Sequence, residues 1–106
     1  MNEVWQDKIP PQDIEAEQAV LGAIFLDSDT LIDAMEIVTP RSFYRRSHQI
    51  IFQSMIQLSN RGEAIDLVTL KAEIEKSNAL EDIGGISYLS ELSQSTPSSA
   101  SVSYYA

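Results

Sequence analysis

Apolar residues recur along the chain at the three- and four-residue spacings of helices that bury one face. The first such stretch follows the extended segment 9–11, and Asp13 before it is a candidate N-cap. Glu15 and Glu17 would lie in the first turn, where the helix dipole favours acidic side chains. The predicted apolar face consists of Ile14, Val20, Leu21, Ile24 and Phe25. The pattern therefore predicts a helix that begins after Asp13.

Two further stretches show the same periodicity and end at helix-stop signals. A second helix is predicted over 28–38, before Pro40. Its buried positions would be Leu31, Met35 and Val38. A third helix is predicted over 44–60, and Gly62 supplies its stop. Its buried face would consist of His48, Ile51, Phe52, Met55, Leu58 and Ser59.

The last two predicted helices lie on either side of a glycine turn. Asp66 is expected to cap a fourth helix that closes near Asn78. The turn at 83–85 then precedes a fifth helix, which would bury Ile86, Leu89 and Leu92. No stretch alternates with the period of two that β-branched strands show. We therefore predict an all-α fold, a compact bundle of five to six short helices.

Three parts of the chain are predicted from this pattern. Residues 1–12 form an N-terminal arm, and residues 13–97 form the globular helical domain. Residues 98–106 read as the start of another helix, because Pro97 is a suitable entry and no stop follows it. We expect this last helix to continue in a longer protein.

The composition narrows the class of protein. The chain has 106 residues, of which 43% are hydrophobic, and its mean hydropathy is −0.12. No apolar run approaches the roughly 20 residues of a membrane helix, and no secretory signal begins the chain. The absence of cysteine excludes disulfides, zinc–thiolate sites and thiol nucleophiles. We expect a cytoplasmic domain with no membrane partner.

The net charge is −9, and the charged residues are unevenly distributed along the chain. Residues 1–36 and 63–106 are acidic, whereas residues 37–62 carry four arginines and no acid. Three of these arginines and a tyrosine form a candidate patch: Arg41, Tyr44, Arg45 and Arg46. Such a patch can stack on and neutralise single-stranded nucleic acid, dock a protein, or anchor the third helix against acidic neighbours. The overall acidity favours a protein partner over a phosphate backbone.

Reactive chemistry is sparse in the sequence. Ser47 and His48 are neighbours, but successive helical residues point about 100° apart, so they do not form a nucleophile–base pair. A small hydrolase built on them is therefore the weakest hypothesis, and we expect His48 to be a hydrogen-bonded core histidine. No glycine precedes a lysine, so no phosphate-binding loop and no cofactor site is predicted.

Acidic pairs are expected on solvated faces. They are Glu15/Glu17, Asp27/Asp29, Glu73/Glu75 and Glu81/Asp82. Glu17 projects towards the apolar side of its helix, and we expect it to pair with an arginine of the third helix. Tyr88 lies off the buried stripe of the fifth helix. It is either a surface ring of the kind found in protein hot spots or a half-buried packing residue.

Five blocks of sequence together resemble one family. They are IPPQDIEAEQAVLGAIFLD at 9–27, FYRRSHQIIFQSM at 43–55, IDLVTLKAEIE at 65–75, IGGISYLSEL at 83–92 and TPSSASVSYYA at 96–106. In this order they resemble the N-terminal domain of bacterial replicative DNA helicases of the DnaB type, in its Firmicutes-like form.

The resemblance implies a noncatalytic part of a hexameric, ATP-dependent helicase. ATP and Mg²⁺ would bind in a RecA-like motor domain beyond a linker, so this chain would hold no cofactor, hydrolyse no ATP and bind little or no DNA. In that family the N-terminal domains pair with one another into a collar and receive the helicase-binding domain of primase; loader or initiator proteins are further possible partners. By this resemblance Glu15 and Tyr88 would face primase. A stand-alone helical adaptor and a single-strand-binding module that uses the Arg41–Arg46 patch stay open as alternatives.

Overall fold

The computed structural model describes residues 13–94, and all regular structure in this part of the chain is helical. Its α-helices are α2 (Ile14–Leu26), α3 (Thr30–Met35), α4 (Arg46–Asn60), α5 (Leu67–Glu75) and α6 (Gly85–Gln94), joined by the 3₁₀ turns η1 (Pro40–Ser42) and η2 (Glu81–Ile83). The all-α prediction is confirmed. The predicted arm at 1–12 and the predicted helix start at 98–106 lie outside the described residues.

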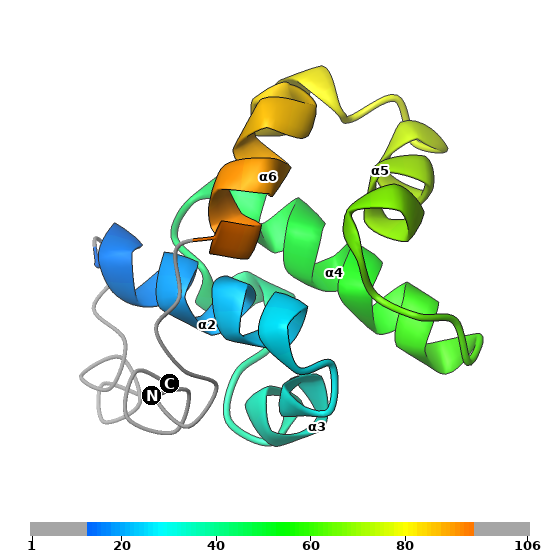
Figure 1. Cartoon of the computed structure of the whole chain (residues 1–106). Helices are drawn as coiled ribbons and strands as arrows, with labels where there is room; N and C mark the ends of the chain where they lie inside the picture. The colour runs from blue at the N-terminus through cyan, green and yellow to red at the C-terminus, as the bar shows by residue number, and fades with distance from the viewer. Residues whose placement is uncertain (1–12, 95–106) are drawn as a thin grey trace.

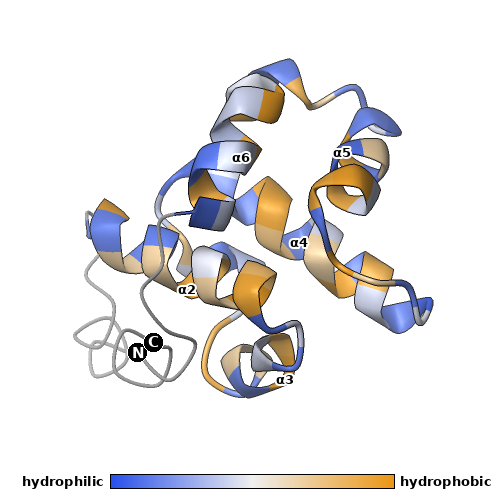
Figure 2. Cartoon of the chain, viewed as in Figure 1, coloured by the Kyte–Doolittle hydropathy of each residue, from blue (hydrophilic) through white to orange (hydrophobic). Residues whose placement is uncertain are grey.

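The longest helix, α4, crosses the domain, and α2 and α5 both pack against it (Figure 1). Helix α6 contacts α2 and α5, and the short α3 packs on α2. Apolar residues occur in each of these helices, whereas the turns that join α2 to α3 and α5 to α6 are mainly polar (Figure 2). None of the described helices has the length and apolar character that crossing a membrane requires.

One apolar core joins the helices. Its fully buried large side chains include Leu21, Ile24, Leu31, Ile51, Phe52, Met55, Leu58, Leu70, Ile74, Leu89 and Leu92. Removing such side chains from water is the main favourable term in folding. All five α-helices contribute residues to this core.

The two predicted N-caps, Asp13 and Asp66, are confirmed by their hydrogen bonds. The Asp13 carboxylate accepts from the backbone N–H of Ala16 at 3.0 Å. The Asp66 carboxylate accepts from the N–H of Thr69 at 2.9 Å, and the Thr69 hydroxyl accepts from the N–H of Asp66 at 3.0 Å. This reciprocal arrangement is a capping box, which satisfies two otherwise unpaired N–H groups.

The predicted glycine stops are also confirmed. Gly62 follows α4 with φ 73°, and Gly84 follows η2 with φ 102°, both in the left-handed region that glycine adopts without strain. A Cβ on Gly84 would lie 3.0 Å from the Cβ of Tyr88. Gly84 therefore allows the chain to turn close to the start of α6.

Three of the predicted buried faces were partly wrong. The second helix is shorter than 28–38, and its inward face is Leu31, Ala34 and Val38, while Met35 is 42% exposed. Residues 27–29 form a turn instead, in which the Asp27 carboxylate accepts from the N–H of Asp29 at 3.1 Å. Helix periodicity places Met35 on the opposite side of Leu31 from Ala34, at the edge of the buried face.

The predicted faces of the third and fifth helices also lose one residue each. Leu89 and Leu92 are buried as expected, but Ile86 is 40% exposed. Ile86 and Leu92 lie about 120° apart around the helix, so a face centred between the two leucines leaves Ile86 at its edge. Ser59, the last residue predicted on the buried face of α4, is exposed.

Candidate functional site

A buried polar cluster connects α2, α4 and α6. The side chains of Glu17 and His48 are both 0% exposed, and Glu17 Oε1 lies 2.7 Å from His48 Nδ1. His48 Nε2 lies 2.5 Å from the hydroxyl of Tyr88, and the two rings stack at an interplanar angle of 14°. The predicted core histidine is confirmed. Because both ring nitrogens are engaged, His48 has none left to activate Ser47, and the hydrolase hypothesis is wrong.

Glu17 also holds the start of α4. Its Oε2 accepts from the backbone N–H of Tyr44 at 2.6 Å, and its Oε1 is 3.4 Å from the backbone N of Arg45. A carboxylate in this place satisfies unpaired N–H groups and interacts favourably with the helix dipole.

These contacts correct two predictions. Glu17 points inward as predicted and is buried, but it pairs with His48 and with backbone amides and not with an arginine side chain. The third helix begins at Arg46 and not at residue 44, because Arg45 has an extended backbone with φ −78° and ψ 129°. The N–H groups of Tyr44 and Arg45 donate to the Glu17 carboxylate.

Tyr88 is half-buried, and its hydroxyl is the meeting point of three helices. The oxygen accepts from Gln18 Nε2 at 3.1 Å and lies 3.4 Å from Arg45 Nη1. Of the two alternatives for Tyr88, the half-buried packing residue is therefore correct for the ring. Its hydroxyl contacts Gln18 of α2, Arg45 before α4 and His48 of α4. The groups that extend outward around it belong to Gln18 and Arg45.

The two predicted sites meet at this point. Glu15 is exposed one turn before Gln18 on α2, so both side chains lie on one side of that helix. Arg45 is exposed and reaches Tyr88. We call Glu15, Gln18, Arg45 and Tyr88 the α2–α4–α6 face. The predicted primase-facing pair and Arg45 of the predicted arginine patch thus form parts of one surface.

The arginine patch is exposed around the start of α4. Arg41 lies in η1, Arg45 and Arg46 begin α4, and Tyr44 is 58% exposed. Within residues 13–94 none of these three guanidinium groups forms an ion pair with a described residue. The alternative in which these arginines anchor the third helix against acidic neighbours is therefore wrong within residues 13–94. Glu17 and the packing of Phe43 on Phe52, at 5.0 Å between ring centroids, hold this end of α4 instead.

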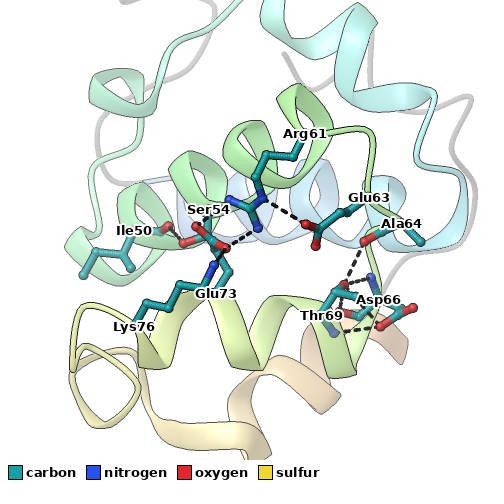
Figure 3. A network of polar contacts seen from close by, with 9 residues as sticks. All are labelled: Ile50, Ser54, Arg61, Glu63, Ala64, Asp66, Thr69, Glu73 and Lys76. Carbon is teal, nitrogen blue, oxygen red and sulfur yellow. Dashed lines mark hydrogen bonds and ion pairs between the residues drawn. The ribbon is translucent and has the colours of Figure 1, made fainter.

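A second polar cluster links the end of α4 to α5 (Figure 3). Arg61 Nη2 donates to Glu73 Oε1 at 2.6 Å, and Arg61 Nε donates to Glu63 at 3.0 Å. Lys76 also donates to Glu73, at 3.3 Å. The Glu73 side chain is only 7% exposed, so the solvated interpretation is wrong for it. The i,i+3 spacing of Glu73 and Lys76 is the sequence signal that could have indicated part of this cluster.

The charges of this cluster shift the pKa values of its carboxyl groups. The hydrogen bond from Arg61 holds the pKa of Glu73 below its ordinary value of 4.5, and Lys76 adds to this effect. The same arginine lowers the pKa of Glu63. Hydrogen bonding to Glu73 raises the pKa of Arg61, so the cluster is fully ionised near neutral pH.

In both clusters the buried carboxylates accept hydrogen bonds from described residues. In residues 13–94 no three His, Cys, Asp or Glu side chains are grouped as metal ligands. The buried acidic groups, Glu17 and Glu73, are each satisfied by donors from a neighbouring helix or turn. Such fully satisfied networks fix the relative positions of helices. The arrangement is suited to presenting a defined surface.

Comparison with known proteins identifies relatives over nearly the whole chain. The family model described as the DnaB-like helicase N terminal domain matches residues 9–106. The chain is 56% identical to the replicative DNA helicase DnaB of Geobacillus stearothermophilus and 50% identical to the replicative DNA helicase DnaC of Bacillus subtilis, in both cases over all 106 residues. These alignments cover 23% of each relative, so the chain spans about a quarter of their length.

The fold has a solved counterpart. The crystal structure of the N-terminal domain of DnaB helicase from Mycobacterium tuberculosis superposes with a TM-score of 0.85 at 42% sequence identity. The match covers 91% of this chain and 70% of that chain. It agrees with the resemblance found in the five sequence blocks. On its family model, its relatives and its fold, the chain belongs to the family of DnaB-like helicase N-terminal domains.

Proposed function

We propose that this domain is the noncatalytic collar and primase-docking module of a bacterial replicative DNA helicase. The observation that carries the proposal is the family match over residues 9–106, together with relatives that are named replicative DNA helicases. The domain acts in the cytoplasm at the replication fork. In this proposal, unwinding and the binding of ATP and Mg²⁺ belong to a motor domain of the parent helicase, outside the 23% of its relatives that this chain spans.

The α2–α4–α6 face supplies the docking surface for the helicase-binding domain of primase. Tyrosine and arginine are enriched among residues that contribute most to protein interfaces. This face contains Tyr88 and Arg45 together with the polar side chains of Glu15 and Gln18. The hydrogen bonds to the Tyr88 hydroxyl restrict the conformations of the side chains that make them. A surface that is already ordered loses less conformational entropy when a partner binds.

The collar role places copies of the domain in contact within a hexamer. A partner that binds one arrangement of the copies more tightly shifts the collar towards that arrangement. Primase docking would in this way change the state of the ring, and ring state would change primase affinity by the same factor. Loader or initiator proteins would use the same coupling.

A second candidate function is weak binding of single-stranded nucleic acid by Arg41, Tyr44, Arg45 and Arg46. It is favoured by the exposure of Tyr44 and by three guanidinium groups that no described acidic residue neutralises. The net charge of −9 opposes it. Docking of protein at this patch fits the same observations without that opposition.

Calorimetric titration with the helicase-binding domain of primase tests the docking role. The hexamer of the parent helicase is compared with a hexamer that carries Glu15→Ala and Tyr88→Ala. We expect the double variant to bind at least tenfold more weakly, whereas Ile32→Ala on the exposed side of α3 leaves the affinity unchanged. Equal binding by wild type and the double variant, or no binding by wild type, would overturn the proposal.

A further inference from the structure

The docking proposal makes no use of the most deeply buried polar pair of the domain. Glu17 and His48 are 0% exposed, so neither can touch a partner. We propose that Glu17 and His48 are positioning residues for the docking surface: they set the direction of the hydrogen bond made by the Tyr88 hydroxyl and thereby hold Tyr88, Gln18 and Arg45 for the partner. This inference rests on the proposed function for its partner, but its geometry is independent of it.

The hydrogen atoms of the cluster can be assigned from its donors and acceptors. Both oxygens of Glu17 face backbone N–H groups, as an acceptor-only carboxylate requires. His48 Nδ1 must therefore donate to Glu17. We assign Nε2 of His48 the role of acceptor. The Tyr88 hydroxyl then donates to Nε2.

The outer side of Tyr88 follows from this assignment. Once its hydrogen points inward to His48, the Tyr88 oxygen has only acceptor capacity left. Both groups that approach it, the amide of Gln18 and the guanidinium of Arg45, are donors. The whole chain of hydrogen bonds therefore runs in one direction, from the surface through Tyr88 and His48 to Glu17.

The inner end of this chain is fixed by the backbone. Glu17 accepts from the N–H groups that precede α4, and His48 lies in the first turn of the same helix. Glu17 thus anchors the start of α4 and the imidazole together. A change at Glu17 would reach the surface through His48 and Tyr88, although its own side chain is buried.

Glu17→Gln is the sharpest test because it keeps the shape of the side chain and replaces one acceptor oxygen with a donor NH₂ group. A glutamine has one acceptor oxygen and one NH₂ group, so it cannot accept from both His48 Nδ1 and the N–H of Tyr44. If the NH₂ group faces His48, the ring must donate from Nε2, and the Tyr88 hydroxyl can no longer donate inward. Glu36→Gln, an exposed glutamate after α3, provides the same chemical change as a control.

The first experiment needs no partner. Nitrogen-15 NMR of the 106-residue chain reports which imidazole nitrogen of His48 carries the proton. We expect a proton on Nδ1 in wild type and in Glu36→Gln, and a different or mixed tautomer in Glu17→Gln. A proton on Nε2 in wild type, or an unchanged tautomer in a folded Glu17→Gln variant, would overturn the inference.

The second experiment measures coupling at the docking surface. Affinity of the parent hexamer for the helicase-binding domain of primase is measured for Glu17→Gln, Tyr88→Phe, the double variant and Glu36→Gln. We expect Glu17→Gln and Tyr88→Phe each to weaken binding about fivefold, and Glu17→Gln to add almost nothing in the Tyr88→Phe background. Glu36→Gln should bind as wild type does.

The outcomes separate this inference from the docking proposal. Additive losses would mean that Glu17 does not act through the Tyr88 hydroxyl, and full affinity of Tyr88→Phe would mean that the hydroxyl is unimportant for docking; either result overturns the inference while docking stands. If wild type fails to bind, docking is wrong and the NMR result alone decides the inference. If Glu17→Gln does not fold, Tyr88→Phe and the wild-type tautomer decide it.

Discussion

Arg61 and Glu73 are joined by a hydrogen bond of 2.6 Å between Nη2 and Oε1, although they lie on opposite sides of the turn between α4 and α5. The Glu73 side chain is nearly buried, while Arg61 is 40% exposed. The contact therefore joins α5 to the end of α4, which are otherwise connected by the mostly exposed loop 61–66. Since the ion pair requires an ionised carboxylate, its strength depends on pH.

The pH dependence of stability should reveal this contact. The pKa of Glu73 is lowered in the folded chain by Arg61, so its stabilising effect is complete above the unfolded value near 4.5 and is lost as pH falls through the folded value. Glu73→Gln should be less stable than wild type at pH 7, and the difference should shrink below about pH 4.5. Urea unfolding followed by circular dichroism at a series of pH values measures it.

Glu75→Gln is the matched control on the same helix. Its side chain is 48% exposed and, among residues 13–94, forms an ion pair only with Lys71 at i,i+4, an arrangement that contributes little. Its stability should follow that of wild type at every pH. A constant gap between Glu73→Gln and wild type down to pH 3 would contradict the role given to the Arg61 ion pair.

The capping box of α5 should contribute measurably to stability. Asp66→Ala removes the acceptor for the Thr69 N–H and should lower the free energy of unfolding by about 1 kcal/mol. Asp29→Ala, at the N-cap of α3, should change it far less, since the Asp29 side chain forms no capping hydrogen bond. Chemical denaturation of the two variants makes the comparison, and equal losses would be inconsistent with the assigned cap.

Leu89 and Ile86 differ in burial although both belong to the apolar spacing of α6. Leu89→Ala should destabilise the domain by about 2–5 kcal/mol, because Leu89 is fully buried. Ile86→Ala should cost less than about 1 kcal/mol, because Ile86 is 40% exposed. Thermal and urea unfolding of both variants test this order, which a reversed ranking would refute.

The arginine patch separates the two candidate functions. If Arg41, Arg45 and Arg46 bound single-stranded nucleic acid, affinity would fall with salt at a logarithmic slope of about −2, from roughly 0.7 per phosphate contact. We expect no oligonucleotide binding above background in fluorescence anisotropy, even at low salt. Salt-sensitive binding that disappears in the triple alanine variant would favour the nucleic-acid function instead.

Local features of this domain could be predicted from the sequence because their causes are local. The two N-caps, Asp13 and Asp66, bond to residues three positions away, and Gly62 ends α4 from the position two residues after it. The apolar pattern of α4 is long enough to identify the helix even though one residue, Ser59, does not fit it. Helix type and order therefore followed from spacing alone.

The polar clusters could not be predicted because they join residues far apart in the sequence. The contact of Glu17 with His48 spans 31 positions, and that of His48 with Tyr88 spans 40. Which donor a buried carboxylate meets depends on how α2 is placed on α4, and spacing within one helix carries no such information. The sequence indicated that Glu17 points inward and that Tyr88 is unusual, but not that His48 links them.

The docking surface itself is tested most directly by NMR mapping. Backbone amide shifts of the 106-residue chain are followed while the helicase-binding domain of primase is added. The account predicts that the largest changes cluster at Glu15, Gln18, Arg45 and Tyr88, with residues of α3 and α5 unaffected. Changes centred on α3 or α5, or none at saturating primase domain, would contradict it.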